Sequence, residues 1–357
     1  MIIVLSIFLL LSPFFTFLCP VSFSRIGAMG REGCFFLLIL FAGFKIFFNK
    51  VKFQRIQLVL FIFICIELLY CIIYPTNFGV ILIYTSGPIL FFTISCIKIN
   101  NIPRKIRIIT ILTSLFIILN LLIYRYQYLL LAVARVNSDD VWQHLYRNGS
   151  IRLFGITFMP TIMAFICILS LVFSNNMLMK YISIFAWYLT GARLFIPGLF
   201  ISIYHNLKKK FKVYLSFFFI IFGLFLIYYI TSNADDSIIK HLDDLFVKGP
   251  TLFIENFYGC VFSKDISIES DLFIYFIRFG LLVGLFYTNI FFLLFRIYNK
   301  KTLFDDSIIK KGRNLLIIYF MASIFLPLTL QRPLCNMFWL YEGLIFSYRR
   351  QLCMNPQ

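Results

Sequence analysis

Residues 56–74 read IQLVLFIFICIELLYCIIY, an almost unbroken run of apolar side chains. About 20 such residues in a row are needed to cross the hydrocarbon layer of a membrane as a helix. Residues 2–19 form a second run of this kind. Within a bilayer the backbone must satisfy its own hydrogen bonds, which leaves helices or closed β-barrels. Barrel strands alternate apolar and polar residues, and these runs do not, so the sequence predicts membrane-spanning helices.

The composition of the whole chain agrees with these runs. Of its 357 residues 61% are hydrophobic and only 13% are charged, and the mean hydropathy is +0.91. A soluble domain has about 25% charged residues, which it needs to cover a water-facing surface. The composition therefore excludes a soluble fold and favours a polytopic membrane protein.

The formal net charge of +18 raises the question of a nucleic-acid partner. The basic residues, however, fall in short clusters between the apolar runs, at 50–55, 104–107, 208–212, 300–313 and 349–350. Clusters of Lys and Arg at the ends of apolar runs are typical of cytoplasmic loops. We therefore expect the bilayer as the partner of this chain, and no nucleic acid.

The charge clusters and apolar runs together predict an all-α transmembrane bundle, a single membrane domain over residues 1–357. Helices are expected at about 2–20, 33–49, 56–74, 79–97, 108–124, 159–175, 211–230, 271–296, 314–330 and 335–348. The stretch 181–206 lies between two cytoplasmic clusters and is too short for two full spans, so it should form a short hairpin that turns near Thr190 to Arg193. The result is about twelve crossings with both termini in the cytoplasm.

Two larger loops, 125–158 and 231–270, are expected on the external side. Most of the 33 basic residues fall on the cytoplasmic side of this topology, whereas Asp305 and Asp306 are the only acids clearly placed there. The first apolar segment lacks a basic start and a small-residue cleavage site, so we expect a retained anchor. Only Cys260 is plainly in an external loop, which argues against a disulfide framework.

Each external loop contains a pattern typical of a short amphipathic helix. In the first, Ser138 precedes two acids, and apolar residues up to Tyr146 share one helical face. In the second, apolar residues from Ile238 to Phe246 repeat with helical spacing. Such helices would lie along the membrane surface, either as simple tethers or as a lid over a cleft at the outer leaflet.

Arginines on the external side oppose the usual charge distribution. A charge near the centre of a bilayer costs about 2.5–3.5 kcal/mol. Such arginines could pair with internal acids, for which Glu67 and Glu342 are the candidates, or they could bind an anion. Because guanidinium groups suit phosphate oxygens, the set favours a lipid-linked pyrophosphate. The external arginines are Arg125, Arg135, Arg147, Arg152, Arg193, Arg278 and Arg332.

Acids near the outer face are the candidate bases for glycosyl transfer, which must deprotonate the attacking sugar hydroxyl. Glu269 and Asp271 immediately precede the apolar run that starts at Leu272, and Asp271 could equally be a helix cap. His241 is a further candidate, although a histidine in a loop is often only solvated. Paired aspartates such as 243–244 diverge on a helix, so no metal site is expected. No phosphate-binding loop, dinucleotide fingerprint or zinc spacing is present, so no cofactor is expected either.

Three short motifs give the sequence a resemblance to a known family. They are RLFG at 152–155, LTGAR at 189–193, and SDLFIY at 270–275 followed by GLLVGL at 280–285. In this order and topology they resemble the Arg-x-x-Gly, Thr-Gly-Ser-Arg and acid-plus-tyrosine motifs of bacterial O-antigen polymerases, within the wider O-antigen ligase and polymerase group. Ala192 replaces the usual serine of the second motif.

The resemblance implies a metal-independent, inverting glycosyltransferase in the bacterial inner membrane. It would transfer a growing chain from undecaprenyl pyrophosphate to a new lipid-linked repeat unit at the periplasmic face. Its partners would be the undecaprenyl-pyrophosphate-linked donor and acceptor and a polysaccharide chain-length regulator. Arg152 and Arg193 would bind pyrophosphate, supported by Arg147 and Arg278 among the external arginines. Asp271 would lie near the acceptor.

Other functions stay open at this point. The related ligases tend to have a histidine followed by asparagine where this chain has Asp271, so that residue favours a polymerase. Arg278 stands where the family often has an acid. A flippase for lipid-linked oligosaccharides would also have about twelve helices with central cations, but such transporters have short loops. A structural membrane protein is the remaining alternative.

Overall fold

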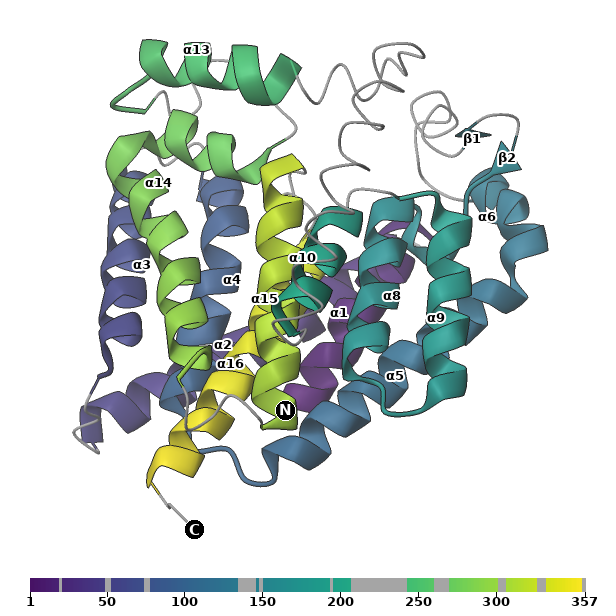
Figure 1. Cartoon of the computed structure of the whole chain (residues 1–357), viewed down its shortest axis with the longest axis horizontal. Helices are drawn as coiled ribbons and strands as arrows, with labels where there is room; N and C mark the ends of the chain where they lie inside the picture. Colours follow the sequence, from purple (N-terminus) through teal and green to yellow (C-terminus); the bar gives the residue numbers. More distant parts are fainter. Residues whose placement is uncertain are drawn as a thin grey trace. The chain divides into compact units, whose positions relative to one another are not determined.

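A computed structural model describes almost only helices (Figure 1). The described residues are 1–18, 21–48, 53–73, 78–133, 146–147, 150–192, 195–206, 243–259, 270–300, 306–325 and 332–354. Their one sheet is a two-stranded antiparallel ribbon of β1 (Tyr146–Arg147) and β2 (Ser150–Ile151). The expected all-α class is confirmed.

The chain divides into two compact units. Unit 1 comprises Met1–Arg193, Lys300–Leu315 and Thr329–Gln357, and unit 2 comprises Leu194–Asn299 and Leu316–Leu328. The helix α15 (Ser307–Phe325) contributes to both. Beside the ribbon and α15, unit 1 contains α1 (Ile2–Phe17), α2 (Val21–Phe48), α3 (Arg55–Ile73), α4 (Phe78–Cys96), α5 (Ile102–Leu122), η2 (Tyr124–Tyr126), α6 (Gln127–Val133), η3 (Gly155–Thr157), α8 (Pro160–Phe173), α9 (Met177–Thr190) and α16 (Arg332–Met354).

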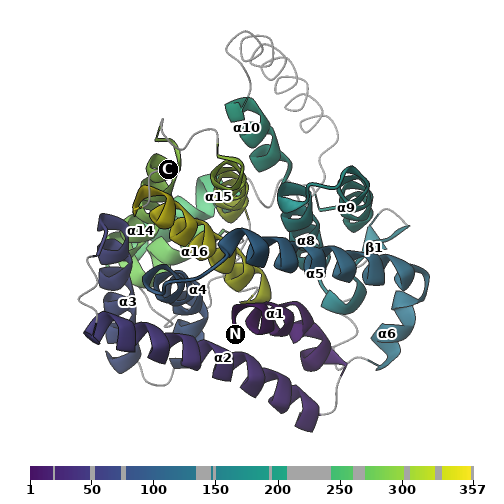
Figure 2. The same cartoon turned by 90° about the horizontal axis from the view of Figure 1, so that it is seen from below.

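The core of unit 1 is built around α16, which packs most extensively along α4. Residues 336–347 of α16 are all buried, and the ring of Trp339 meets Phe91 of α4 edge-on at 5.9 Å between centroids. Elsewhere in the unit α8 packs against α9, and α5 crosses this pair (Figure 2). The first two sequence motifs lie at the ends of this pair: RLFG precedes α8, and LTGAR begins at the end of α9.

Beyond its basic first turns, α5 has an apolar exposed face and several buried polar side chains. Its exposed side chains include Ile111, Leu115, Leu119 and Leu122, which follow one helical face and are between 44% and 71% exposed. Its buried side chains include Thr110, Thr113, Ser114 and Asn120. These polar groups bond to carbonyls one turn back or, for Ser114, to the hydroxyl of Ser170 on α8 at 2.9 Å. A helix of a soluble protein would have the reverse distribution.

Two helices of the described chain are long and apolar enough to cross a membrane, Ile102–Leu122 and Leu272–Tyr298. Buried core helices of soluble proteins meet the same criterion, so this finding alone is weak evidence for a membrane protein. The expected helices that fall in described regions are present, with ends that differ by a few residues. The expected helix at 211–230 lies outside the described residues.

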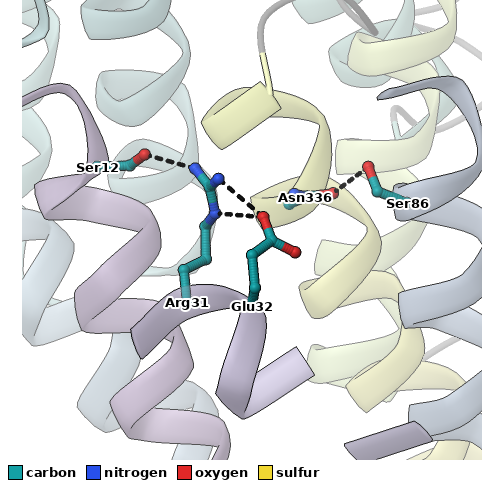
Figure 3. Close-up of polar contacts among 5 residues, drawn as sticks. All are labelled: Ser12, Arg31, Glu32, Ser86 and Asn336. Atoms are coloured by element: carbon teal, nitrogen blue, oxygen red, sulfur yellow. Dashed lines mark hydrogen bonds and ion pairs between the residues drawn. The ribbon is translucent and has the colours of Figure 1, made fainter. Parts of the chain in front are cut away.

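The largest displaced boundary is that of α2, which was expected at residue 33 and begins at Val21. The charged pair Arg31 and Glu32 therefore lies within a helix instead of a loop. Figure 3 shows why the charges are tolerated: Arg31 on α2 donates to Ser12 of α1 at 2.8 Å and to the carboxylate of Glu32 at 2.8 Å. In the same close-up Ser86 of α4 donates to Asn336 of α16 at 3.2 Å.

The prediction that the helix in the first expected loop extends to Tyr146 is wrong. Tyr146 was placed on a helical face, and the structure puts it in β1, opposite Ile151 of β2. The two residues between the strands in sequence are Asn148 and Gly149, a pair that favours tight hairpin turns over a helix end. The remainder of that expected helix, residues 138–145, lies outside the described part of the chain.

Unit 2 contains α10 (Ile196–Asn206), the π-helical turn η4 (Asp244–Lys248), α13 (Gly249–Glu255), α14 (Asp271–Tyr298) and the second part of α15. The expected helix at 271–296 is not continuous, because Gly280 has φ 80° and ψ 175°. Figure 1 shows the first part of α14 running beneath α13 before the chain turns. The amide of Leu281 donates to the carbonyl of Phe257 at 3.1 Å instead of bonding within the helix.

The break depends on two glycines in backbone contact. A side chain at Gly259 would approach the carbonyl oxygen of Arg278 to 2.8 Å, and one at Gly280 would approach Tyr258 equally closely. Aromatic rings fix the two parts on either side: Phe253 of α13 meets Phe276 edge-on, and Tyr275 stacks on Tyr287 at 3.9 Å. Residues 257–259, which lie within the second expected external loop, are thereby attached to the middle of α14.

Candidate functional site

Arg152 connects the first two sequence motifs within unit 1. It follows β2, is half-buried, and its Nε–H donates to the carbonyl oxygen of Thr190 at 2.6 Å. The neighbouring amide of Leu153 donates to the carbonyl of Leu189 at 2.8 Å. Two segments almost forty residues apart in sequence are therefore joined by one side-chain and one backbone hydrogen bond.

The turn that receives Arg152 is defined by its own hydrogen bonds. Gly191 ends α9 in the left-handed conformation with φ 62°, which favours glycine. The hydroxyl of Thr190 donates to the carbonyl of Trp187 at 2.6 Å and accepts from the amide of Ala192 at 3.2 Å. The indole of Trp187 donates to the carbonyl of Ala192 at 2.8 Å. A side chain at Gly191 would also approach the Nε of Arg152 to 3.3 Å, so the glycine leaves room for the guanidinium.

Gln127, at the start of α6, holds the backbone around Arg152. The side chain is 1% exposed. Its amide nitrogen donates to the carbonyl of Arg152 at 2.9 Å, and its oxygen accepts from the amides of Phe154 and Gly155 at 3.1 and 3.0 Å. One side chain thus satisfies three backbone groups of the RLFG motif.

Two further side chains extend this support to both ends of the motif. Tyr124 of η2 donates to the carbonyl of Ile151 at 2.8 Å, and the oxygen of Asn120 on α5 accepts from the amide of Ile156 at 2.7 Å. Gly155 has φ 51°, and a side chain there would lie 1.8 Å from the oxygen of Asn120. The last position of RLFG therefore requires glycine on two grounds, backbone conformation and space.

The segment 151–158 is irregular backbone buried among helices. Residues 153–158 are all buried, and partners from α5, η2, α6 and α9 hydrogen-bond to its carbonyls and amides. Buried backbone groups without partners are costly, and irregular backbone at membrane depth is found only where protein satisfies it. This support gives Arg152 a defined position at the end of α9.

The other predicted site residues are only partly described. Arg193, His241 and Glu269 lie outside the described residues. Arg147 is in β1, and the backbone places it opposite Ser150, close in sequence to Arg152. Arg278 is half-buried in the first part of α14, in unit 2, next to the helix break. The structure thus brings Arg152 to the LTGAR motif, while the grouping of the other arginines stays a prediction.

Asp271 is the first residue of α14, as expected, but it is not the cap. Ser270 occupies the N-cap position, and its hydroxyl accepts from the amide of Phe273 at 3.4 Å. The cap role for Asp271 is therefore excluded, and its role as a base stays a prediction.

The candidate acids show no metal-binding arrangement in the described regions. Among those residues no group of three or more His, Cys, Asp and Glu side chains could hold a metal ion. Asp243, one of the paired loop aspartates, forms an ion pair with Lys248 at 2.9 Å. Glu67 and Glu342, the candidate internal partners of an arginine, are both fully buried.

The residues that position Arg152 were not predicted from the sequence. Gln127 and Asn120 are amides at the edge of or within an apolar run, where an amide without a partner would be costly. That cost is the signal that could have identified them, since a buried amide must have partners. Which backbone it binds depends on tertiary packing.

Chemically, this arrangement offers a fixed guanidinium at the end of a helix. The bond to Thr190 fixes the plane of the guanidinium group, and a planar guanidinium is the side chain best suited to the oxygens of a phosphate. An arginine at a helix C-terminus also interacts favourably with the helix dipole, so the same contact stabilises α9.

Comparison with models of known protein families finds no match to this chain, and a search of curated proteins finds no relative.

Proposed function

We propose that the chain is a polytopic inner-membrane glycosyltransferase that polymerises undecaprenyl-pyrophosphate-linked O-antigen repeat units at the periplasmic face. The membrane part of the proposal is supported by α5. Its four exposed aliphatic side chains and four buried polar ones fit a helix with lipid on one side and protein on the other. About twelve crossings with cytoplasmic termini remain part of the proposal.

The observation that carries the enzymatic proposal is the contact between Arg152 and Thr190. The resemblance assigns the RLFG and LTGAR motifs to one pyrophosphate site, and such a site requires that they meet. They do so through the bonds from Arg152 and Leu153, and each motif glycine has a local reason to be conserved in this geometry. We assign Arg152 and Arg193 to the pyrophosphate of the donor.

In the proposed reaction a hydroxyl oxygen of the acceptor sugar attacks the anomeric carbon of the donor. The bond from that carbon to the pyrophosphate oxygen breaks, and undecaprenyl pyrophosphate leaves. The hydroxyl proton passes to a base, for which Asp271 is the first candidate and Glu269 and His241 are the others. Arginine stabilises the negative charge that develops on the leaving pyrophosphate, and no metal is required.

Deletion of the gene in a host with a long surface polysaccharide tests the assignment. Loss of a polymerase leaves lipopolysaccharide core with one repeat unit. Loss of a ligase leaves bare core, and loss of a flippase leaves lipid-linked units on the cytoplasmic side. The ladder of lipopolysaccharide lengths on a gel distinguishes these outcomes, and either of the last two contradicts the proposal.

Complementation with variants then tests the site. Arg152→Ala and Arg152→Lys should both lose long polymer at unchanged protein level, because lysine lacks the planar, bidentate group. Arg104→Ala is the matched control, since Arg104 is exposed at the start of α5 and belongs to a basic cluster expected in the cytoplasm. A ladder of normal length with either Arg152 variant would remove Arg152 from the proposed site.

A further inference from the structure

Gln127 is the most highly connected side chain near the candidate site. It lies in α6, which no sequence motif includes, and its amide is buried and uses both its donor and its acceptor. Its bonds reach backbone groups on both sides of Leu153, from the carbonyl of Arg152 to the amide of Gly155. Glutamine suits this role because one planar amide group carries N–H donors and an accepting oxygen.

The position of Arg152 follows from these bonds. Its own carbonyl is held by Gln127, the preceding carbonyl by Tyr124, and the following amide by Leu189. With the backbone fixed on three sides, the guanidinium reaches Thr190 at 2.6 Å without freedom to shift along the chain. Alignment of this kind matters, because a displacement of about 1 Å can cost about 100-fold in the rate of a reaction.

We propose that Gln127 is a positioning residue, which fixes Arg152 over the Thr190–Ala192 turn by holding the backbone from Arg152 to Gly155. The identity of the ligand as a pyrophosphate rests on the proposed function, whereas the positioning of Arg152 by Gln127 does not. Gln127 therefore affects pyrophosphate affinity only through Arg152 and makes no contact with the ligand.

The test is a double-mutant cycle on the full-length protein in detergent, with farnesyl pyrophosphate as the probe. Gln127→Asn shortens the side chain by one methylene, so it can no longer reach all three backbone groups. It should weaken binding by about 10- to 100-fold, the loss expected when a hydrogen bond from a charged group is misaligned. In the Arg152→Lys background the same substitution should have little further effect, because the group that it positions is already gone. Equal losses in both backgrounds would overturn the inference.

Asn176→Ala is the matched control. Asn176 caps the opposite end of α9, where its side chain accepts from the amide of Leu178 at 2.9 Å. The substitution removes an amide–backbone bond from the same helix without touching Arg152, and it should leave probe affinity unchanged. A loss equal to that of Gln127→Asn would mean that general destabilisation explains both, against the inference.

Hydrogen–deuterium exchange separates failure of the inference from failure of the proposed function. If wild type and Arg152→Lys bind the probe equally, the pyrophosphate assignment fails, and exchange still tests the positioning. Amides 153–156 should be protected in wild type, exchange faster in Gln127→Asn, and stay protected in Asn176→Ala. Unchanged exchange in Gln127→Asn would show that Gln127 does not hold this segment.

Discussion

Gly155 and Gly191 show how single residues determine the candidate site. Both have positive φ. A side chain at Gly155 would overlap the amide of Asn120, and one at Gly191 would make a tight contact with the Nε of Arg152. The sequence identified both glycines as parts of motifs. It could not identify Asn120 or Gln127, because nothing in the order of residues shows which backbone a buried amide will bind.

Substitution of Gly155 tests this account of the motif. Gly155→Ala should lower the free energy of unfolding, since the left-handed conformation alone costs about 1–2 kcal/mol with a side chain. The added carbon would also displace Asn120 from the amide of Ile156. Thermal unfolding in detergent measures the effect.

Gly33→Ala is the control, because it lies within α2 and a side chain there would meet nothing within 4 Å. That variant should be about 0.5–1 kcal/mol more stable than wild type, as alanine is favoured over glycine inside helices. Equal unfolding temperatures for the two variants would contradict the explanation given for Gly155.

At the scale of elements, apolar runs predicted helices well and their ends less well. The runs located α1, α3, α4, α8 and α14 to within a few residues, since about 18 or more apolar residues leave few alternatives. The start of α2 was missed because Arg31 and Glu32 are charged residues typical of a loop, and the sequence does not show that Ser12 lies beside Arg31. The break in α14 was missed because Gly280 lies in an apolar run that reads as continuous.

The exposed face of α5 gives a prediction about its surroundings. With the protein in lipid vesicles, a nitroxide label at Leu115→Cys should collide with dissolved oxygen far more often than with a water-soluble nickel chelate. Oxygen concentrates in hydrocarbon and the chelate does not enter it. A label at Arg104→Cys, exposed at the start of α5, is the control and should show the reverse. Preferential access of the chelate to the label at 115 would contradict a lipid-facing α5.

For the whole molecule, the distribution of basic residues predicts which parts of the chain lie in the cytoplasm and which lie in the periplasm. Fluorescent-protein fusions ending near residues 105 and 310 should fluoresce, because those basic clusters are expected in the cytoplasm. Alkaline phosphatase fusions near 150 and 250 should be active, because the enzyme requires the oxidising periplasm. Fluorescence from a fusion at 150 or 250 would place the candidate arginines on the wrong side for a periplasmic reaction.

The backbone contact between Gly259 and Gly280 has a consequence for how this chain can diversify. The amide of Leu281 bonds to the carbonyl of Phe257, so these two points of the chain are fixed to one another. The entropy of closing a loop between two fixed points grows only slowly with the length of the loop. We therefore expect the fold to tolerate insertions and substitutions within residues 260–269, provided that Gly259 and Gly280 are both retained.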